Sequence, residues 1–182
     1  MLLLMNPQQR KQQNLTAIYQ ALLQLMTDKP MANIAITELC QKAHVSRTYF
    51  YRNYHSFDDI IIAFQEQNML NYLRHLPNAR KINLLELMTH YFELTKSEAN
   101  TSKLLIKNGK LTILIKTFQT VFQLLIRQQR INNRTYAIFN EPYYLEFFSG
   151  AVVNVATDWL ARGTPEPPEY LAQQVERFAH HR

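Results

Sequence analysis

Residues 36–54 read ITELCQKAHVSRTYFYRNY. The stretch predicts two short helices of about two turns each, joined by a tight turn at His44 and Val45. Thr37 and Ser46 are residue types that cap helix starts, and Phe50 would turn toward the core. This helix-turn-helix arrangement can present its second helix to the major groove of DNA.

The second of these helices carries side chains that suit DNA. Arg47 can bind a guanine edge with two hydrogen bonds, and Thr48 can donate to a base or contact a thymine methyl group. Tyr49 and Tyr51 can offer hydroxyl groups to phosphates or bases. The alternative is that two short helices in any helical protein produce a similar pattern.

Positive charge is denser at the N-terminal end of the chain. Residues 1–56 contain six lysines and arginines against two acidic residues, whereas the rest of the chain contains fourteen against twelve. Such an excess is typical of a surface that meets a polyanion, although a solvated basic face would give the same count.

Composition excludes several classes of protein. With 47% hydrophobic and 19% charged residues the chain is not disordered, and its three scattered glycines exclude a glycine-rich phosphate loop. The single cysteine, Cys40, excludes a disulfide framework, and we expect it to be a small buried residue. No stretch has the length of a signal-peptide core or a membrane helix, so we expect a cytoplasmic protein with no membrane partner.

Helical spacing of apolar residues dominates the whole chain and predicts an all-α fold of about nine helices. Residues 1–56 form the predicted helix-turn-helix domain, and residues 57–182 form a helical domain for dimerisation and effector binding. A long helix that starts after Ser56 and has apolar residues on two faces joins them. The predicted helices cover residues 7–29, 37–43, 47–54, 57–76, 82–99, 101–107, 110–129, 142–162 and 167–180.

No pattern of catalytic or metal-binding residues stands out. The six histidines lack ligand spacing with carboxylates, and no serine, cysteine or lysine has a recognisable base beside it. We therefore predict no catalytic residue, no metal site and no cofactor, and a protein that is not an enzyme.

The amino-acid sequence of residues 37–61 also resembles that of a known protein family. TELCQKA at 37–43, VSR at 45–47, FYRNY at 50–54, Ser56 and DDII at 58–61 resemble the N-terminal DNA-binding domain of the TetR family of transcriptional regulators. The resemblance covers about residues 12–64. YYLEFFSG at 143–150, with WLARG at 159–163, resembles the last part of one C-terminal domain found in such regulators. The family pattern implies a helical C-terminal domain for dimerisation and ligand binding.

The resemblance implies which residues face DNA, and the chain departs from the family pattern at two positions. His44 stands where glycine is common, so a left-handed turn there would be strained. Phe57 stands where lysine often meets a phosphate, so we expect one contact to be missing, although backbone N–H groups at that helix start can bind phosphate. The candidate DNA-binding residues are Thr37, Lys42, Ser46, Arg47, Thr48, Tyr49, Tyr51 and Asn53.

The helix predicted to start at Pro142 is apolar on more than one side, and it contains a mid-helix glycine. Close approach of a second helix would compensate for that glycine, which favours a dimer interface with Phe147, Gly150, Ala151, Asn154 and Trp159. Core packing within one subunit is the alternative. The candidate walls of a ligand pocket are Phe92, Phe118, Phe122, Tyr144, Phe148 and Trp159.

Together these features predict a homodimeric, sequence-specific regulator that binds a near-palindromic operator in double-stranded DNA. We expect a repressor that is released or modulated by a small-molecule effector, which would shift a two-state equilibrium and move the helix at 57–76. The alternatives are an activator of the same fold, or a dimeric interaction protein or nonspecific DNA-binding protein that uses the same N-terminal unit.

Overall fold

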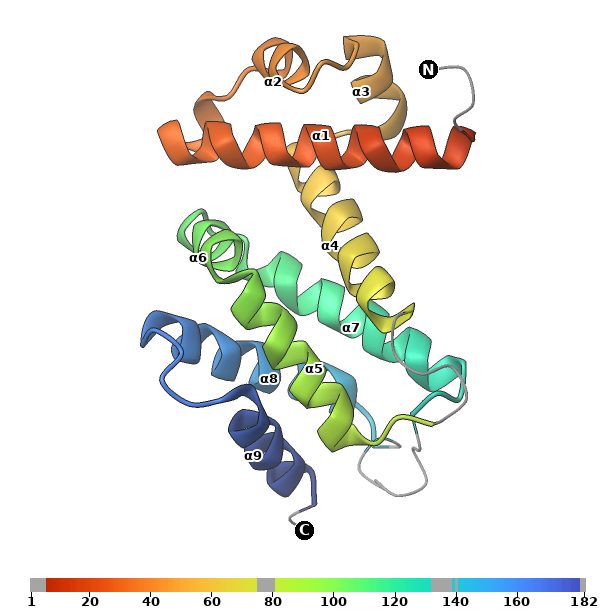
Figure 1. Ribbon diagram of the computed structural model, residues 1–182, viewed down its shortest axis with the longest axis vertical. Helices are drawn as coiled ribbons and strands as arrows, with labels where there is room; N and C mark the ends of the chain where they lie inside the picture. Colours follow the sequence, from red (N-terminus) through yellow and green to blue (C-terminus); the bar gives the residue numbers. More distant parts are fainter. Residues whose placement is uncertain (1–5, 75–80, 132–138, 140, 181–182) are drawn as a thin grey trace. The chain divides into compact units, whose positions relative to one another are not determined.

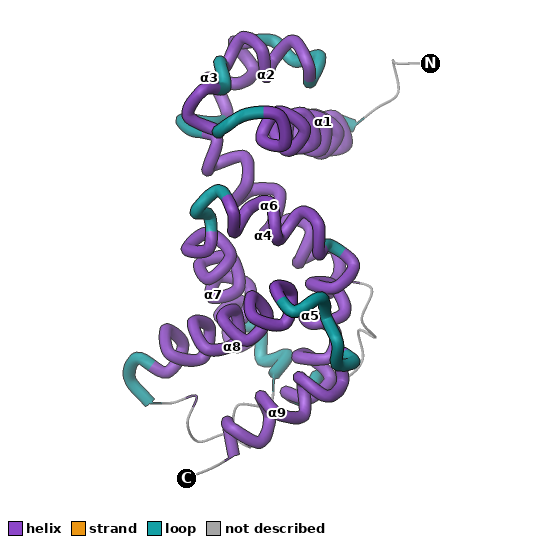
Figure 2. Tube along the Cα trace, turned by 90° about the vertical axis from the view of Figure 1, so that its left-hand side faces the viewer, coloured by secondary structure: helices purple, strands orange, loops and turns teal. Residues whose placement is uncertain are grey.

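The computed structural model describes residues 6–74, 81–131, 139 and 141–180. These residues form nine α-helices and one short 3₁₀ helix, with no strand among them, which confirms the all-α prediction (Figure 1). Figure 2 shows helices in both units, with loops and turns between them. The chain divides into two compact units, residues 1–67 and 68–182, and the division falls inside α4.

The first unit contains α1 (Pro7–Asp28), the 3₁₀ helix η1 (Met31–Asn33), α2 (Ile36–Lys42), α3 (Arg47–Asn53) and the first half of α4 (Phe57–Arg74). Asn6 caps α1: its side chain accepts from the backbone N–H of Gln8 at 3.1 Å, and its own N–H donates to the Gln9 side chain at 3.2 Å. This reciprocal pair satisfies donors that a helix start leaves unpaired.

The turn between α2 and α3 follows the prediction at two residues and departs from it at a third. Ser46 caps α3 by accepting from the N–H of Tyr49 at 3.0 Å, and His44 has the left-handed φ of 54°. Thr37 does not cap α2. That helix begins at Ile36, and the N-cap position is Ala35, two residues before Thr37, with no side-chain cap. Thr37 therefore lies in the first turn with its side chain exposed.

The second unit contains the end of α4 and five further helices: α5 (Leu84–Ser97), α6 (Ala99–Lys107), α7 (Leu111–Arg127), α8 (Tyr144–Ala161) and α9 (Pro168–His180). Helix α5 packs against α9, and α7 packs against α8. Their apolar faces form one core, which includes Met88, Phe92, Phe122, Val152 and Trp159.

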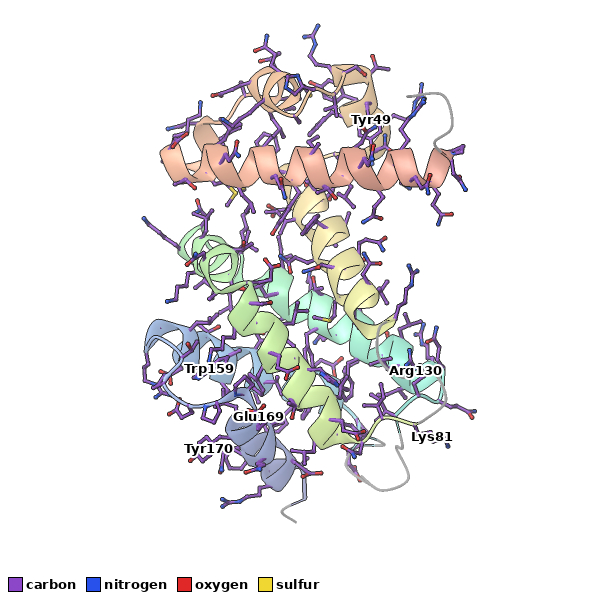
Figure 3. The ribbon with its side chains drawn as sticks, viewed as in Figure 1. Tyr49, Lys81, Arg130, Trp159, Glu169 and Tyr170 are labelled. Atoms are coloured by element: carbon purple, nitrogen blue, oxygen red, sulfur yellow. The ribbon has the colours of Figure 1, made fainter. Side chains whose placement is uncertain are left out.

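Two backbone features fix the ends of helices in the second unit. Gly109 takes a left-handed φ of 73° between α6 and α7, a conformation that glycine adopts readily at the end of a helix. The N–H of Ile82 donates to the carbonyl of Arg130 at 2.8 Å, and Ile82 forms an isolated bridge with Ile131. This contact ties the start of α5 to the end of α7, where Lys81 and Arg130 are labelled in Figure 3.

Candidate nucleic-acid interface

Helix α3 is anchored by its apolar residues. Phe50 is buried, and its ring meets the rings of Tyr54 and Phe57 at centroid distances of 6.0 and 6.2 Å. Leu39 of α2 is also buried. Because these side chains turn inward, the helical spacing directs the intervening residues of α3 toward solvent.

Seven of the eight predicted DNA-binding residues have exposed side chains on this helix-turn-helix. Tyr51 is the largest of them and is 61% exposed. Two of the seven also serve the local fold, since Ser46 caps α3 and the Asn53 side-chain amide donates to the Tyr49 carbonyl at 2.8 Å. The seven are Thr37, Lys42, Ser46, Arg47, Thr48, Tyr51 and Asn53.

Tyr49 is placed differently from the other seven. Tyr49, which is labelled in Figure 3, is half-buried, and its ring meets that of Tyr54 edge-on at a centroid distance of 6.3 Å. Burial raises the pKa of Tyr54, and the neighbouring Tyr49 adds to the shift. The Tyr49 hydroxyl is buried as well, so in this arrangement the side chain packs beneath α3 instead of extending from it.

The charges of the first unit favour a polyanion. Lys29 is paired with Glu38, with 2.6 Å between its Nζ and the carboxylate. The remaining cations around the helix-turn-helix are exposed: Arg10, Lys11, Lys42, Arg47 and Arg52. Arg52 lies on α3 itself, although it was not among the predicted DNA-binding residues.

The start of α4 is already capped by its own side chains. Asp59 accepts from the backbone N–H groups of His55 at 2.7 Å and Ser56 at 3.0 Å, and its own N–H donates to the Ser56 hydroxyl at 3.2 Å. These hydrogen bonds, His55 first, hold the pKa of Asp59 below its usual value. Three backbone donors around this helix start are therefore occupied, and a carboxylate lies beside them.

A second exposed surface lies on α8 and α9. Phe147, Gly150, Ala151 and Asn154 follow one another at helical spacing on α8, and Phe147 is 70% exposed. Phe178 of α9 is 63% exposed, and the two helices border an apolar groove of about 170 Å³. Phe178 was not among the residues predicted to form the dimer interface. Trp159 is fully buried and packs edge-on against Phe92, so it lies in the core, where a partner cannot reach it.

The C-terminal part of the chain decides the family. A family model described as the transcriptional regulator C-terminal region matches residues 82–181, more than half of the chain. The chain belongs to the TetR family of transcriptional regulators.

Two solved structures share the fold of this TetR-family regulator. The dihydroxyacetone kinase operon activator DhaS is 12% identical with a TM-score of 0.58, covering 91% of this chain and 93% of its own. The transcriptional regulator FadR from Bacillus subtilis, in complex with stearoyl-CoA, is 13% identical with a TM-score of 0.50, covering 90% and 96%. The comparison with curated proteins gave no match.

The six aromatic residues predicted to line one ligand pocket of this TetR-family chain are divided between two cavities and a buried ring pair. Phe118 and Phe122 line a cavity of about 30 Å³ between α5 and α7, with Met69, Met88 and Tyr91 among its other walls. Tyr144 and Phe148 border the α8–α9 groove instead. Phe92 and Trp159 line neither and pack on each other.

Three further observations concern other kinds of site. Cys40 is buried as predicted, and burial raises the pKa of its thiol, which disfavours the reactive thiolate. Among the described residues, no group of three or more histidine, cysteine and acidic side chains could hold a metal ion. No helix in the described ranges is both long and apolar enough to cross a membrane.

Proposed function

We propose that this TetR-family chain is a homodimeric regulator that recognises a specific sequence in double-stranded DNA through α3. The observation that carries the proposal is the division of α3 into a buried side, anchored by Phe50, and an exposed polar side with Arg47, Thr48 and Tyr51. A helix held in this way has the side chains and the exposure that major-groove readout needs.

The exposed residues divide into two roles. Arg47 and Thr48 stand in the first turn of α3, where a recognition helix meets base edges, so they are the residues that would specify sequence. Lys42, Tyr51 and Asn53 would contact phosphates and position the helix, as would Thr37. Ser46 and Tyr49 support α3 through its cap and its buried side.

Dimerisation is assigned to α8 and α9. The face with Phe147, Gly150, Ala151 and Asn154 is open to solvent in one subunit, and Phe178 extends the apolar surface onto α9. Exposed aromatic residues beside a groove are a common mark of protein interfaces. A two-fold pairing through this surface gives one particle with two recognition helices, which suits a near-palindromic operator.

The proposed regulator is a repressor whose affinity for DNA is modulated by a small molecule. The cavity between α5 and α7 is the candidate effector site, and Met69 and Met88 can change shape to enlarge it. The solved structure of FadR, which shares the fold, is a complex with stearoyl-CoA, and this supports a small-molecule effector for the proposed regulator. DhaS is an activator, so the direction of regulation is an outcome to be measured.

Selection of bound duplexes from a random pool, with the full-length chain, tests the proposal. We expect one near-palindromic motif to be enriched. A reporter placed behind that motif then separates repression from activation. Retention of DNA without an enriched motif would instead support nonspecific binding, and no retention at all would support a protein interaction module.

A further inference from the structure

Helix α4 is fastened to α1 at one buried tyrosine. Tyr19 of α1 is only 2% exposed, and its ring stacks on that of Phe64 with centroids 3.8 Å apart and planes 11° from parallel. The adjacent residue of α4, Gln65, donates from Nε2 to the Tyr19 hydroxyl at 2.9 Å. Phe64 therefore contacts the face of the Tyr19 ring, and Gln65 binds the hydroxyl group at its edge.

The hydrogen bond between Gln65 and Tyr19 has a preferred direction, unlike the apolar packing around it. Ile60 and Ile61 of α4 are fully buried, but burial of apolar surface has no preferred direction. A hydrogen bond weakens steeply when its angle departs from linear. The bond between Gln65 and Tyr19 therefore adds a directional restraint on the rotation of α4 about its axis to the burial of the isoleucines.

The same face of α4 continues into the second unit. Met69 follows Gln65 by one helical turn, so the two side chains share a face of the helix. Met69 is one of the walls of the cavity between α5 and α7. One helical turn of α4 thus separates Gln65, which is bonded to Tyr19, from Met69, which lines that cavity.

We infer that Tyr19 and Gln65 are positioning residues for operator recognition. Their hydrogen bond fixes the rotation of α4 on α1 and thereby the separation at which a dimer presents its two recognition helices. The inference rests on the proposed function, because the separation has meaning only for a dimer that reads two half-sites.

The test compares half-site spacing preferences. Tyr19→Phe keeps the stacked ring and removes the hydroxyl, and Gln65→Leu removes the amide; Gln24→Leu, on an exposed part of α1, is the matched control. Each full-length variant is titrated with the selected duplex and with duplexes whose half-sites are one base pair closer or farther apart. Thermal denaturation of the same samples reports the fold.

We expect Tyr19→Phe and Gln65→Leu to bind the selected duplex about two- to tenfold more weakly, the range that one net hydrogen bond provides. They should lose little affinity when the spacing changes, whereas the parent chain and Gln24→Leu should lose much more. Gln65→Glu can accept from the Tyr19 hydroxyl, so it should restore the parent's spacing preference.

Two results would overturn the inference. One is a Tyr19→Phe variant with the same spacing preference as the parent chain. If Gln65→Leu does not fold, Tyr19→Phe alone decides the test. The other is an equal loss at every spacing together with a lower melting temperature, which would mark the pair as structural only. Failure of the proposed function shows separately, because the parent chain itself would then enrich no duplex.

Discussion

The side-chain amide of Asn154 donates to the carbonyl of Gly150 at 2.8 Å, on the exposed face of α8. The bond directs the Asn154 side chain back along α8 toward Gly150, which has no side chain of its own. Beyond its chain neighbours and the backbone of its own helix, a Cβ at Gly150 would meet no atom of the subunit within 4 Å. Packing within the subunit therefore does not require this glycine, which costs about 1 kcal/mol relative to alanine in a helix.

The first prediction is that Gly150→Leu weakens the dimer and leaves the subunit folded. The Cβ of a leucine at this position meets no neighbouring side chain of its own subunit, but the leucine would overpack a helix that approaches closely from a second copy, at a cost of about 1–3 kcal/mol. Sedimentation should show a lower mass at the same helical content by circular dichroism. Gln123→Leu, on an exposed position of α7, is the control, and an undiminished dimer would contradict the assignment.

A second prediction separates the contacts of α3 by type. Tyr51→Phe should weaken binding to all duplexes similarly, because phosphate contacts carry no sequence information. Arg47→Ala and Thr48→Ala should also relax the preference at particular base pairs, by roughly 1–3 kcal/mol for a lost two-bond contact. Affinities for a panel of single-base variants of the selected site measure both effects, with Thr120→Ala of α7 as the control. An intact base preference in both alanine variants would show that the recognition helix is misassigned.

The third prediction concerns the cap of α4 and its dependence on pH. Folding lowers the pKa of Asp59 from its usual value of 3.8, so its stabilisation is complete above that value and is lost as the pH falls through the folded pKa. Asp59→Ala should lower the free energy of unfolding at pH 7 by about 0.5–2 kcal/mol, as the loss of a helix cap does. Denaturation titrations should show this deficit shrinking below about pH 4. Glu169→Ala, an exposed carboxylate in the first turn of α9, is the control, and a deficit that persists in acid would argue against the cap.

A fourth prediction restores a phosphate contact. Phe57→Lys should steepen the dependence of binding on salt by about 0.9 in the slope of log K against log salt, since one more phosphate is neutralised. The same variant should melt at a lower temperature because the ring contact between Phe57 and Phe50 is lost. Phe57→Met removes the ring without adding charge, so equal slopes for the two variants would refute the added contact.

Local features were predictable from the sequence, and tertiary partners were not. Ser46 caps α3 as the sequence predicts, and Asn6 and Asp59 form caps of the same local kind, because each cap depends on residues two to four positions away. The start of α2 was misplaced because Thr37 has the chemistry of a cap, whereas the chain enters the helix at Ala35 without one.

The candidate sites show the same limit. Aromatic residues at helical spacing indicate a buried face but not which helix covers it, so Phe122, Phe148 and Trp159 could not be separated into a cavity, a groove and the core. The inward position of Tyr49 depends on its contact with Tyr54 across the end of α3. The exposure of Phe178 could not be predicted, because an exposed apolar stripe and a buried one have the same spacing in the sequence.

The affinity of the full-length chain for its selected duplex, compared with a scrambled duplex of the same composition at about 0.15 M salt, tests the central claim most directly. The account predicts two chains bound per duplex and a preference of about a thousandfold or more for the selected sequence, as is typical of specific DNA-binding proteins. Equal affinity for the two duplexes, or one chain per duplex at saturation, would contradict it.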